Sequence, residues 1–243
     1  MKKLFLILVM LVAMNASGQW QPDVRLTNAP GNSFTSYNNA WCVAANGNVV
    51  HTVWYDYRDG NWEVYYKRST DSGITWATDI RLTNDPAISY ASSIAVSGST
   101  VHIIWHDLRD NNNEIYYKHS TDAGITWGMD KRLTNNTAMS WGPSIAVSGS
   151  VVHVVWNDNR DGNEEIYYKC STDGGINWGV DTRLTNNPSE SQSPSIAVFG
   201  SVVQVVWSDG REGNQNTEIY YKRSTDGGIN WGADTRLTNN LNF

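Results

Sequence analysis

Short runs of β-branched and aromatic residues recur along the whole chain, and clusters of Gly, Asn, Asp and Ser separate them. This pattern is typical of strands joined by tight turns, and no helical period competes with it. In one representative stretch it predicts four successive strands, at residues 144–147, 151–156, 165–171 and 178–185. We therefore expect antiparallel strands throughout and no helix within residues 41–238.

The same four-strand pattern occurs four times, so the chain is a repeat protein. The string S-T-D-x-G-I-x-W returns at spacings of 51, 51 and 53 residues, beginning at Ser69, Ser120, Ser171 and Ser224. Before it stand W-x-D-x-R-[DE], from Trp54, Trp105, Trp156 and Trp207, and E-[IV]-Y-Y-K, from Glu63, Glu114, Glu165 and Glu218. After it comes R-L-T-N, at Arg81, Arg132, Arg183 and Arg236.

Four antiparallel strands in a repeat of about fifty residues are typical of a propeller blade, which buries its two faces only by stacking on neighbours. The predicted fold class is therefore all-β: a β-propeller of four-stranded antiparallel blades, with four blades that form a ring or part of a larger one. Within a repeat domain at 41–243, the blades are predicted at residues 41–84, 92–135, 143–186 and 194–239.

The S-T-D-x-G-x-x-W string resembles the Asp-box, or BNR repeat, of sialidases and related propellers, and the resemblance covers residues 41–238. In that family the box closes the hairpin between a blade's third and fourth strands. Its aspartate can accept hydrogen bonds from turn N–H groups, its glycine permits a positive φ, and its tryptophan packs beneath the turn. The resemblance thus implies structural roles for Asp71, Asp122, Asp173 and Asp226, for Gly73, Gly124, Gly175 and Gly228, and for Trp76, Trp127, Trp178 and Trp231.

The loops between the second and third strands lie on the opposite face, where sialidases have their active site. Arginine forks bind carboxylates, and sialidases use three arginines on the carboxylate of the substrate. Equivalent arginines spread around an axis, however, and an Asp–Arg pair within each loop is the favoured alternative. The candidate ligand-binding residues are Arg58, Arg109, Arg160 and Arg211, with Asp56, Asp107, Asp158 and Asp209.

Two aromatic residues, Tyr90 and Trp141, stand just before the predicted first strands on the same face. They either stack on a sugar or pack between blades. No catalytic residue can be assigned, because the F/Y-R-I-P arginine motif of sialidases is missing and Tyr and Glu recur together in every blade. We expect a non-catalytic binding or scaffold module for carbohydrate or a surface protein; the alternative is an exo-sialidase-type glycoside hydrolase.

No cofactor or metal site is predicted. His51, His102 and His153 share one repeat position, but the fourth repeat has Gln204, a poor metal ligand, so an interior polar role is favoured. The loop at 158–165 is faintly similar to a calcium loop, yet Arg160 stands where an oxygen ligand is required. Cys42 and Cys170 occupy non-equivalent repeat positions, which favours two buried free thiols over a disulfide.

The first 18 residues read as a secretory signal peptide, with a basic start at Lys2 and Lys3, an apolar run at 4–13 and small residues before Gln19. The run is too short to span a bilayer, so we expect a secreted or periplasmic bacterial protein with no membrane insertion. The net charge of −6 becomes more negative once both lysines are removed, which argues against nucleic acid as a partner.

The segment 19–40 contains one further match to the repeat. Asp23–Asn28 resembles a fourth strand, but no first three strands precede it, and each of the four later blades already has its own. We therefore expect the missing blade strands to come from a longer parent chain or from another copy.

Overall fold

The computed structural model describes residues 22–36, 41–213 and 217–239, and all of the regular structure in this part of the chain is β-strand. Four antiparallel sheets follow one another along the sequence, and we call them blades 1 to 4. Blade 1 contains β1 (Ser33–Phe34), β2 (Val43–Asn46), β3 (Val49–Asp56), β4 (Glu63–Ser69) and β5 (Ile80–Arg81). Blade 2 contains β6 (Ser89–Ser97), β7 (Thr100–Asp107), β8 (Glu114–Ser120) and β9 (Lys131–Arg132).

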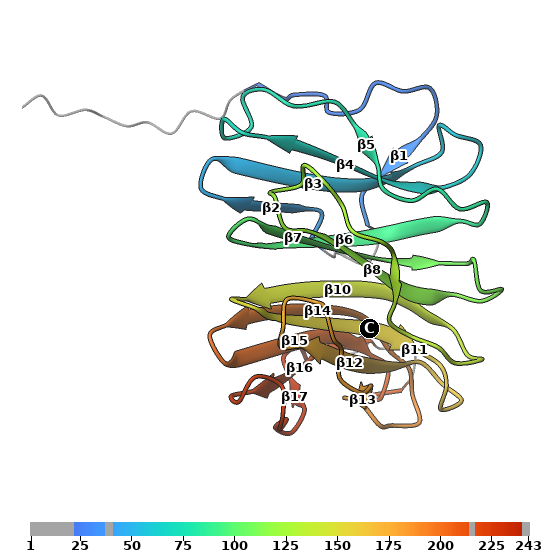
Figure 1. Cartoon of the computed structure of the whole chain (residues 1–243). Coiled ribbons are helices and arrows are strands. Elements are labelled where there is room, and N and C mark those ends of the chain that lie inside the picture. Colours follow the sequence, from blue (N-terminus) through green and yellow to red (C-terminus); the bar gives the residue numbers. More distant parts are fainter. Residues whose placement is uncertain (1–21, 37–40, 214–216, 240–243) are drawn as a thin grey trace, which may run out of the picture.

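Blades 3 and 4 repeat the pattern of blade 2. Blade 3 contains β10 (Ser140–Ser148), β11 (Val151–Asp158), β12 (Glu165–Ser171) and β13 (Thr182–Arg183). Blade 4 contains β14 (Ser191–Phe199), β15 (Val202–Asp209), β16 (Glu218–Ser224) and β17 (Thr235–Arg236). The all-β propeller predicted from the repeats is confirmed by these sheets. The four blades stack in chain order, with blades 1 and 4 at opposite ends (Figure 1).

The strands differ from the predicted ones in two respects. The inner strand begins earlier than predicted, at Ser140 in blade 3, because a bulge between Trp141 and Ser144 lets it continue; Gly142 takes a φ of 59° there. Tyr90 and Trp141 therefore lie inside strands rather than before them. The fourth strand is much shorter than predicted, with two ladder residues in each blade.

In blade 1 the inner strand is split into β1 and β2. Ser33 and Phe34 pair with Asp56 and Tyr55, in the register that Ser89 and Tyr90 adopt in blade 2. The sequence Ser33–Phe34 is thus the start of the first blade, which the prediction placed at residue 41.

Each blade buries two apolar faces against its neighbours. We call the face toward the next blade the trailing face and the face toward the preceding blade the leading face. At the second junction, Ile104, Ile115 and Tyr117 of blade 2 pack on Val152, Val154 and Trp156 of blade 3. The first and third junctions repeat this packing. These junctions hold most of the buried apolar surface, so the core is a series of inter-blade layers.

The S-T-D turns, which we define as residues 69–76, 120–127, 171–178 and 224–231, lie beside the turns between first and second strands. In the second one, Asp122 accepts hydrogen bonds from the backbone N–H and hydroxyl of Thr126, at 2.8 and 2.6 Å. The N–H group that bonds Asp122 is therefore exposed at the surface, whereas a turn sealed by its tryptophan would bury it. The ring N–H of Trp178 donates to the Gly175 carbonyl at 3.0 Å, which ties the tryptophan to its turn.

Residues 1–18, the predicted signal peptide, lie outside the described part of the chain. Among the described residues, none forms a helix with the length and apolar character needed to cross a bilayer.

Candidate functional site

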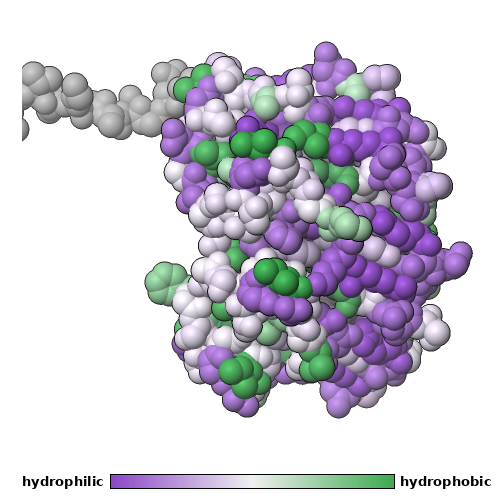
Figure 2. Space-filling model, in the orientation of Figure 1, coloured by the Kyte–Doolittle hydropathy of each residue, from purple (hydrophilic) through white to green (hydrophobic). Residues whose placement is uncertain are grey.

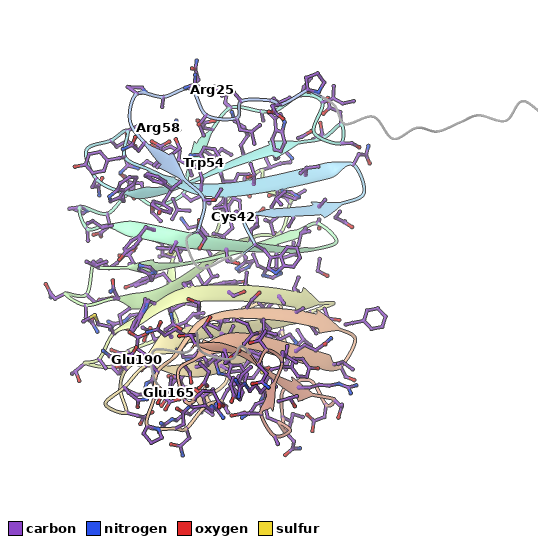
Figure 3. The ribbon with its side chains drawn as sticks, turned by 180° about the vertical axis from the view of Figure 1, so that it is seen from behind. Arg25, Cys42, Trp54, Arg58, Glu165 and Glu190 are labelled. Carbon is purple, nitrogen blue, oxygen red and sulfur yellow. The ribbon has the colours of Figure 1, made fainter. Side chains whose placement is uncertain are left out.

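The loops between second and third strands and the links between blades share one end of the molecule, which we call the loop face. In blade 3, Asn163 in the loop donates to the carbonyls of Asn187 and Ser189 in the link, at 3.0 and 2.9 Å. Figure 3 shows Arg58 of the first blade and Glu190 of the last link near the same edge of the molecule. This edge, at the right of Figure 2, is largely hydrophilic.

The four candidate arginines lie on the loop face, and each is held within its own blade. Arg109 donates to Asp107 at 2.7 Å and to Asp130 at 2.9 Å, and its guanidinium lies over the ring of Tyr116. Arg58, Arg160 and Arg211 repeat these contacts. With two carboxylates on each guanidinium, the arginines are neutralised and do not converge on a common point.

The candidate aspartates are the buried partners in these ion pairs. Burial alone would raise the pKa of Asp56, but hydrogen bonds from Arg58, Ser33 and Trp54 lower it to about 2. The pKa of Asp107 is also lowered: burial raises it, and hydrogen bonds from Arg109 and Trp105 outweigh that effect. Such carboxylates stay ionised and hold their loops, which leaves them without a free proton for acid catalysis.

A second hydrogen-bonded network recurs in each blade and was not predicted from the sequence. Glu114 is fully buried and accepts hydrogen bonds from Arg132 at 2.8 Å and Asn112 at 3.0 Å, and also from the Thr134 hydroxyl. The E-[IV]-Y-Y and R-L-T-N strings are therefore two halves of one ion-pair network in each blade. Their recurrence is explained by the fold.

Side chains that differ between repeats lie on the loop face where blades meet. Where blades 1 and 2 meet they surround a cavity of about 360 Å³, which we call the aromatic pocket, lined by Phe34, Tyr55, Trp62, Ile88, Tyr90 and Leu108. The rings are in mutual contact, with centroids 5.6 Å apart for Phe34 and Trp62, 5.3 Å for Tyr55 and Trp62, and 6.0 Å for Tyr55 and Tyr90. None of the lining residues is charged.

The phenols of the aromatic pocket remain protonated. Burial raises the pKa of Tyr90, and the neighbouring Tyr55 raises it further. Burial also lowers the pKa of His106 to about 3, so this imidazole, which meets the Tyr90 ring edge to face with centroids 3.8 Å apart, is neutral. A neutral concave surface of aromatic rings with hydroxyl tips is suited to an uncharged ligand that has both apolar and hydroxylated faces.

The same positions at the other junctions carry different chemistry. At the junction of blades 2 and 3 they include His106, Asn113, Met139 and Trp141, and at that of blades 3 and 4 they include Asn157, Glu164, Glu190 and Gln192. Burial and the neighbouring Glu190 raise the pKa of Glu164. The loop face thus changes from aromatic to acidic along the stack.

Of the two predicted aromatic candidates, the structure places Tyr90 in the aromatic pocket and Trp141 at the next junction. Phe34, Tyr55 and Trp62 were missed, although the sequence contains a signal for them. When the repeats are aligned, one position is occupied by Tyr55, His106, Asn157 and Ser208. A position that varies in this way is not fixed by the fold, so its side chains are available for a binding site.

The remaining candidates of the sequence have local roles. His102 contacts the Tyr117 hydroxyl at 2.7 Å, and burial lowers the pKa of its ring to about 4. Across the described residues no group of three or more His, Cys, Asp or Glu side chains is placed to hold a metal ion. Cys42 and Cys170 are not joined in a disulfide, and each is half-buried.

A second hollow follows the concave side of the stack. It has a volume of about 470 Å³ and is lined by the inner strands of all four blades, including Val43, Ala95, Ala146 and Val198, with Trp41 at one end. Its small aliphatic side chains offer few polar groups for recognition. The aromatic pocket is therefore the stronger candidate site.

Comparison with known proteins supports the propeller fold and gives distant relatives. No family model matches the chain. A xyloglucanase of Acetivibrio thermocellus is 29% identical over 133 residues, which is 46% of this chain and only 15% of that protein. Among solved structures, the α-L-arabinofuranosidase of Fusarium graminearum in complex with an iminosugar inhibitor has a TM-score of 0.62 at 17% identity, covering 85% of this chain and 70% of that one.

Sialidases have the same architecture. The sialidase of Trypanosoma rangeli in complex with sialic acid has a TM-score of 0.59 at 14% identity and covers 86% of this chain and 41% of that chain. At such identities the likeness shows the fold alone. The chain is a β-propeller with distant similarity to glycoside hydrolases of that architecture.

Proposed function

We propose that this protein is a non-catalytic, secreted binding module that takes neutral oligosaccharides in the aromatic pocket. The observation that carries the proposal is the uncharged cluster of Phe34, Tyr55, Trp62 and Tyr90 around a cavity of about 360 Å³. Aromatic rings pack against the apolar faces of sugars, and their polar tips hydrogen-bond hydroxyl groups. The similarity to a xyloglucanase and an α-L-arabinofuranosidase supports a polysaccharide ligand.

The site chemistry argues against an acidic sugar. A sialic acid carboxylate needs free arginine forks, whereas Arg58 at the loop nearest the pocket is bonded to Asp56 and Asp79, each at 2.7 Å. Displacing two carboxylates from a guanidinium would cost most of the gain from binding a third. Neutral pentose and hexose oligosaccharides therefore fit the pocket better.

Calorimetric titration of residues 19–243 with xylo-, arabino- and cello-oligosaccharides tests this proposal. We expect saturable binding to at least one series, and Trp62→Ala should weaken it by at least about tenfold, or ~1.4 kcal/mol. Phe199→Ala is the matched control, because this ring is 85% exposed at the last residue of β14, at the other end of the blades. Lack of binding to all three series, or equal losses in both variants, would refute the proposal.

One observation favours a second candidate, a glycoside hydrolase. Glu164 and Glu190 are close enough to influence one another, and the raised pKa of Glu164 is a property of general acids. Hydrolysis of aryl glycosides of arabinose and xylose, abolished by Glu164→Gln and Glu190→Gln, would establish this activity. For the exo-sialidase alternative, the assay is turnover of a fluorogenic sialoside with Arg109→Ala and Arg160→Ala as variants; we expect no enzymatic turnover in either assay.

Secretion is the other part of the proposal and rests on residues 1–18. A basic start, a short apolar run and small residues before Gln19 support export and cleavage. N-terminal sequencing of the protein from the periplasm or medium of an expressing bacterium should begin at Gln19. Retention of Met1 in a cytosolic product would contradict this part.

A further inference from the structure

The outer faces of the stack are copies of faces that are buried at every internal junction. In blade 2 the trailing face includes Ile115, fully buried, and Leu133, 7% exposed. The equivalent residues of blade 4 are Ile219, 37% exposed, and Leu237, 55% exposed. Blade 4 thus presents an apolar surface whose shape and chemistry are those of an inter-blade contact, but no blade covers it.

A tyrosine enters the next blade at each internal junction. A Cβ added to Gly124, Gly175 or Gly228 would lie 1.9–2.0 Å from the hydroxyl of Tyr66, Tyr117 or Tyr168 of the preceding blade. Each of these tyrosine rings also meets the tryptophan of the same S-T-D turn, with centroids 4.9 to 5.0 Å apart. The glycine is therefore a socket for the tyrosine of the blade before it.

Each end of the stack has one of the two partners in this contact: blade 1 has the glycine socket, and blade 4 has the tyrosine. At Gly73 in blade 1 an added Cβ would meet only Trp76, at 3.8 Å, so the socket is present and no tyrosine of the described residues enters it. At the other end, the Tyr221 hydroxyl of blade 4 donates to Gln204 of its own blade at 3.3 Å, where its counterparts reach the glycine of a following blade. One end has the socket and the other has the residue that fits it.

At the leading face of blade 1, the N-terminal segment makes the hydrogen bond that the end of a preceding blade makes at an internal junction. Lys118 donates to the carbonyl of Leu82 at 2.6 Å, and Lys67 donates to that of Leu26 at 2.6 Å. Arg25–Asn28 has the sequence of Arg236–Asn239, and Arg25 bonds the Thr27 carbonyl as Arg236 bonds that of Thr238. This segment therefore occupies the position that a preceding blade would give to its own R-L-T-N string.

We propose that the trailing face of blade 4 binds the leading face of blade 1 of a second copy of this chain. Tyr221 enters the socket at the partner's Gly73. The carbonyl of Leu237 replaces that of the partner's Leu26 as the acceptor for the partner's Lys67. Because the two tetrapeptides are identical in sequence, the exchange returns the same hydrogen bonds that it breaks, while Ile219 and Tyr221 gain apolar contact. Exchange of equivalent elements is a low-cost route to assembly.

The contact joins different surfaces of the two copies, so it is heterologous. Each copy keeps one free end of each kind, and the contact repeats until the rotation closes a ring or a longer chain forms. Assembly by this contact also covers the leading face of β3, where Val50 and Thr52 are only half-buried while their counterparts Val101 and Ile103 are fully buried.

Light scattering and sedimentation velocity on residues 19–243, over a wide range of protein concentration, test the proposal. We expect the mass to rise with concentration to that of a dimer or a longer assembly. Ile219→Glu should weaken association by at least about tenfold, because a charge is buried at the contact. Phe199→Glu is the control, since its side chain is 85% exposed and lies outside the trailing face, so the added charge stays in solvent.

A second variant tests the exchange itself. Leu26→Asp should release the N-terminal segment and strengthen association, whereas any merely destabilising effect would weaken it. Hydrogen exchange of the wild-type protein supplies a measurement that needs no variant: amides of residues 50–52 and 219–221 should become more protected as concentration rises. A wild-type monomer at every concentration, or association unchanged by Ile219→Glu, would overturn the proposal.

Discussion

The first and third junctions on the loop face are built from strands in equivalent register, but the side chains that line them differ. At the first, Tyr55, Trp62 and Ile88 form an uncharged aromatic wall. At the third, the same positions hold Asn157, Glu164 and Glu190. The neighbouring residues of both keep the same ion pair, in which a buried glutamate meets an arginine of the R-L-T-N string.

This difference separates the residues of the fold from the residues available for function. A side chain that recurs in all four blades is needed for the blade to fold, because four equivalent positions around the molecule cannot all belong to one ligand site. A side chain that changes from blade to blade is released from that requirement. The most repeated motifs of the chain are thus the least informative about its ligand.

The largest expected effect concerns the repeated contact between blades. Gly175→Ala should cost about 3–4 kcal/mol of stability, because alanine must adopt a positive φ of 91° and collide with the buried Tyr117 hydroxyl. Gly73→Ala has the same backbone strain at a φ of 87° but no tyrosine, and should cost about 1–2 kcal/mol. Urea unfolding measures both; equal losses would show that the tyrosine contact contributes nothing.

Two adjacent glutamates give the next contrast. Glu165 is fully buried and bonded to Arg183 at 2.7 Å, so Glu165→Ala should cost about 2–3 kcal/mol by leaving the arginine poorly paired. Glu164 belongs to the variable loop face, and Glu164→Ala should change stability by less than about 0.5 kcal/mol. Thermal unfolding of the pair checks the prediction, which fails if Glu164→Ala is the more damaging change.

The sequence predicted those features that depend on repetition and local pattern. The third strand was predicted residue for residue as Glu165–Ser171, because its run of β-branched and aromatic residues and its bounding polar residues leave little freedom. The early start of β10 was missed, because a bulge at Gly142 depends on contact with His106 of the preceding blade, at 3.3 Å. The split inner strand of blade 1 was missed because Ser33–Phe34 is too short to show a period.

The site was predicted less well than the fold, for a related reason. Arg58 and its counterparts were named because arginine binds carboxylates, with an Asp–Arg pair within each loop as the favoured alternative, and the structure places each arginine in such a pair within its own blade. Tyr90 was chosen for its chemistry, but its neighbours Phe34 and Trp62 are distant from it in sequence and meet it only when two blades pack. Local pattern does not report such contacts between blades.

A smaller effect is expected for the S-T-D turns. Asp122→Ala removes the acceptor for Thr126 at the surface, and should lower the melting temperature by less than Gly175→Ala does. Binding of oligosaccharide at the aromatic pocket should be unchanged, because the turn lies at the opposite end of the blade. Loss of binding with an unchanged melting temperature would instead give this aspartate a functional role.

The smallest expected effect is a dependence of these turns on acid. Hydrogen bonds from the backbone N–H of Asn177, then from the side chains of Ser171 and Asn177, lower the pKa of Asp173 to about 2 from its ordinary 3.8. A carboxylate with a depressed pKa in the folded state stabilises fully above its unfolded value, and this contribution is lost as the pH falls from about 4 to about 2. Asp173→Asn should therefore lower the melting temperature at pH 7 and make little difference near pH 2. Glu190→Gln, at the exposed loop face, serves as the control. A penalty for Asp173→Asn that is the same at both pH values would mean that the turn depends on the shape of this side chain and not on its charge.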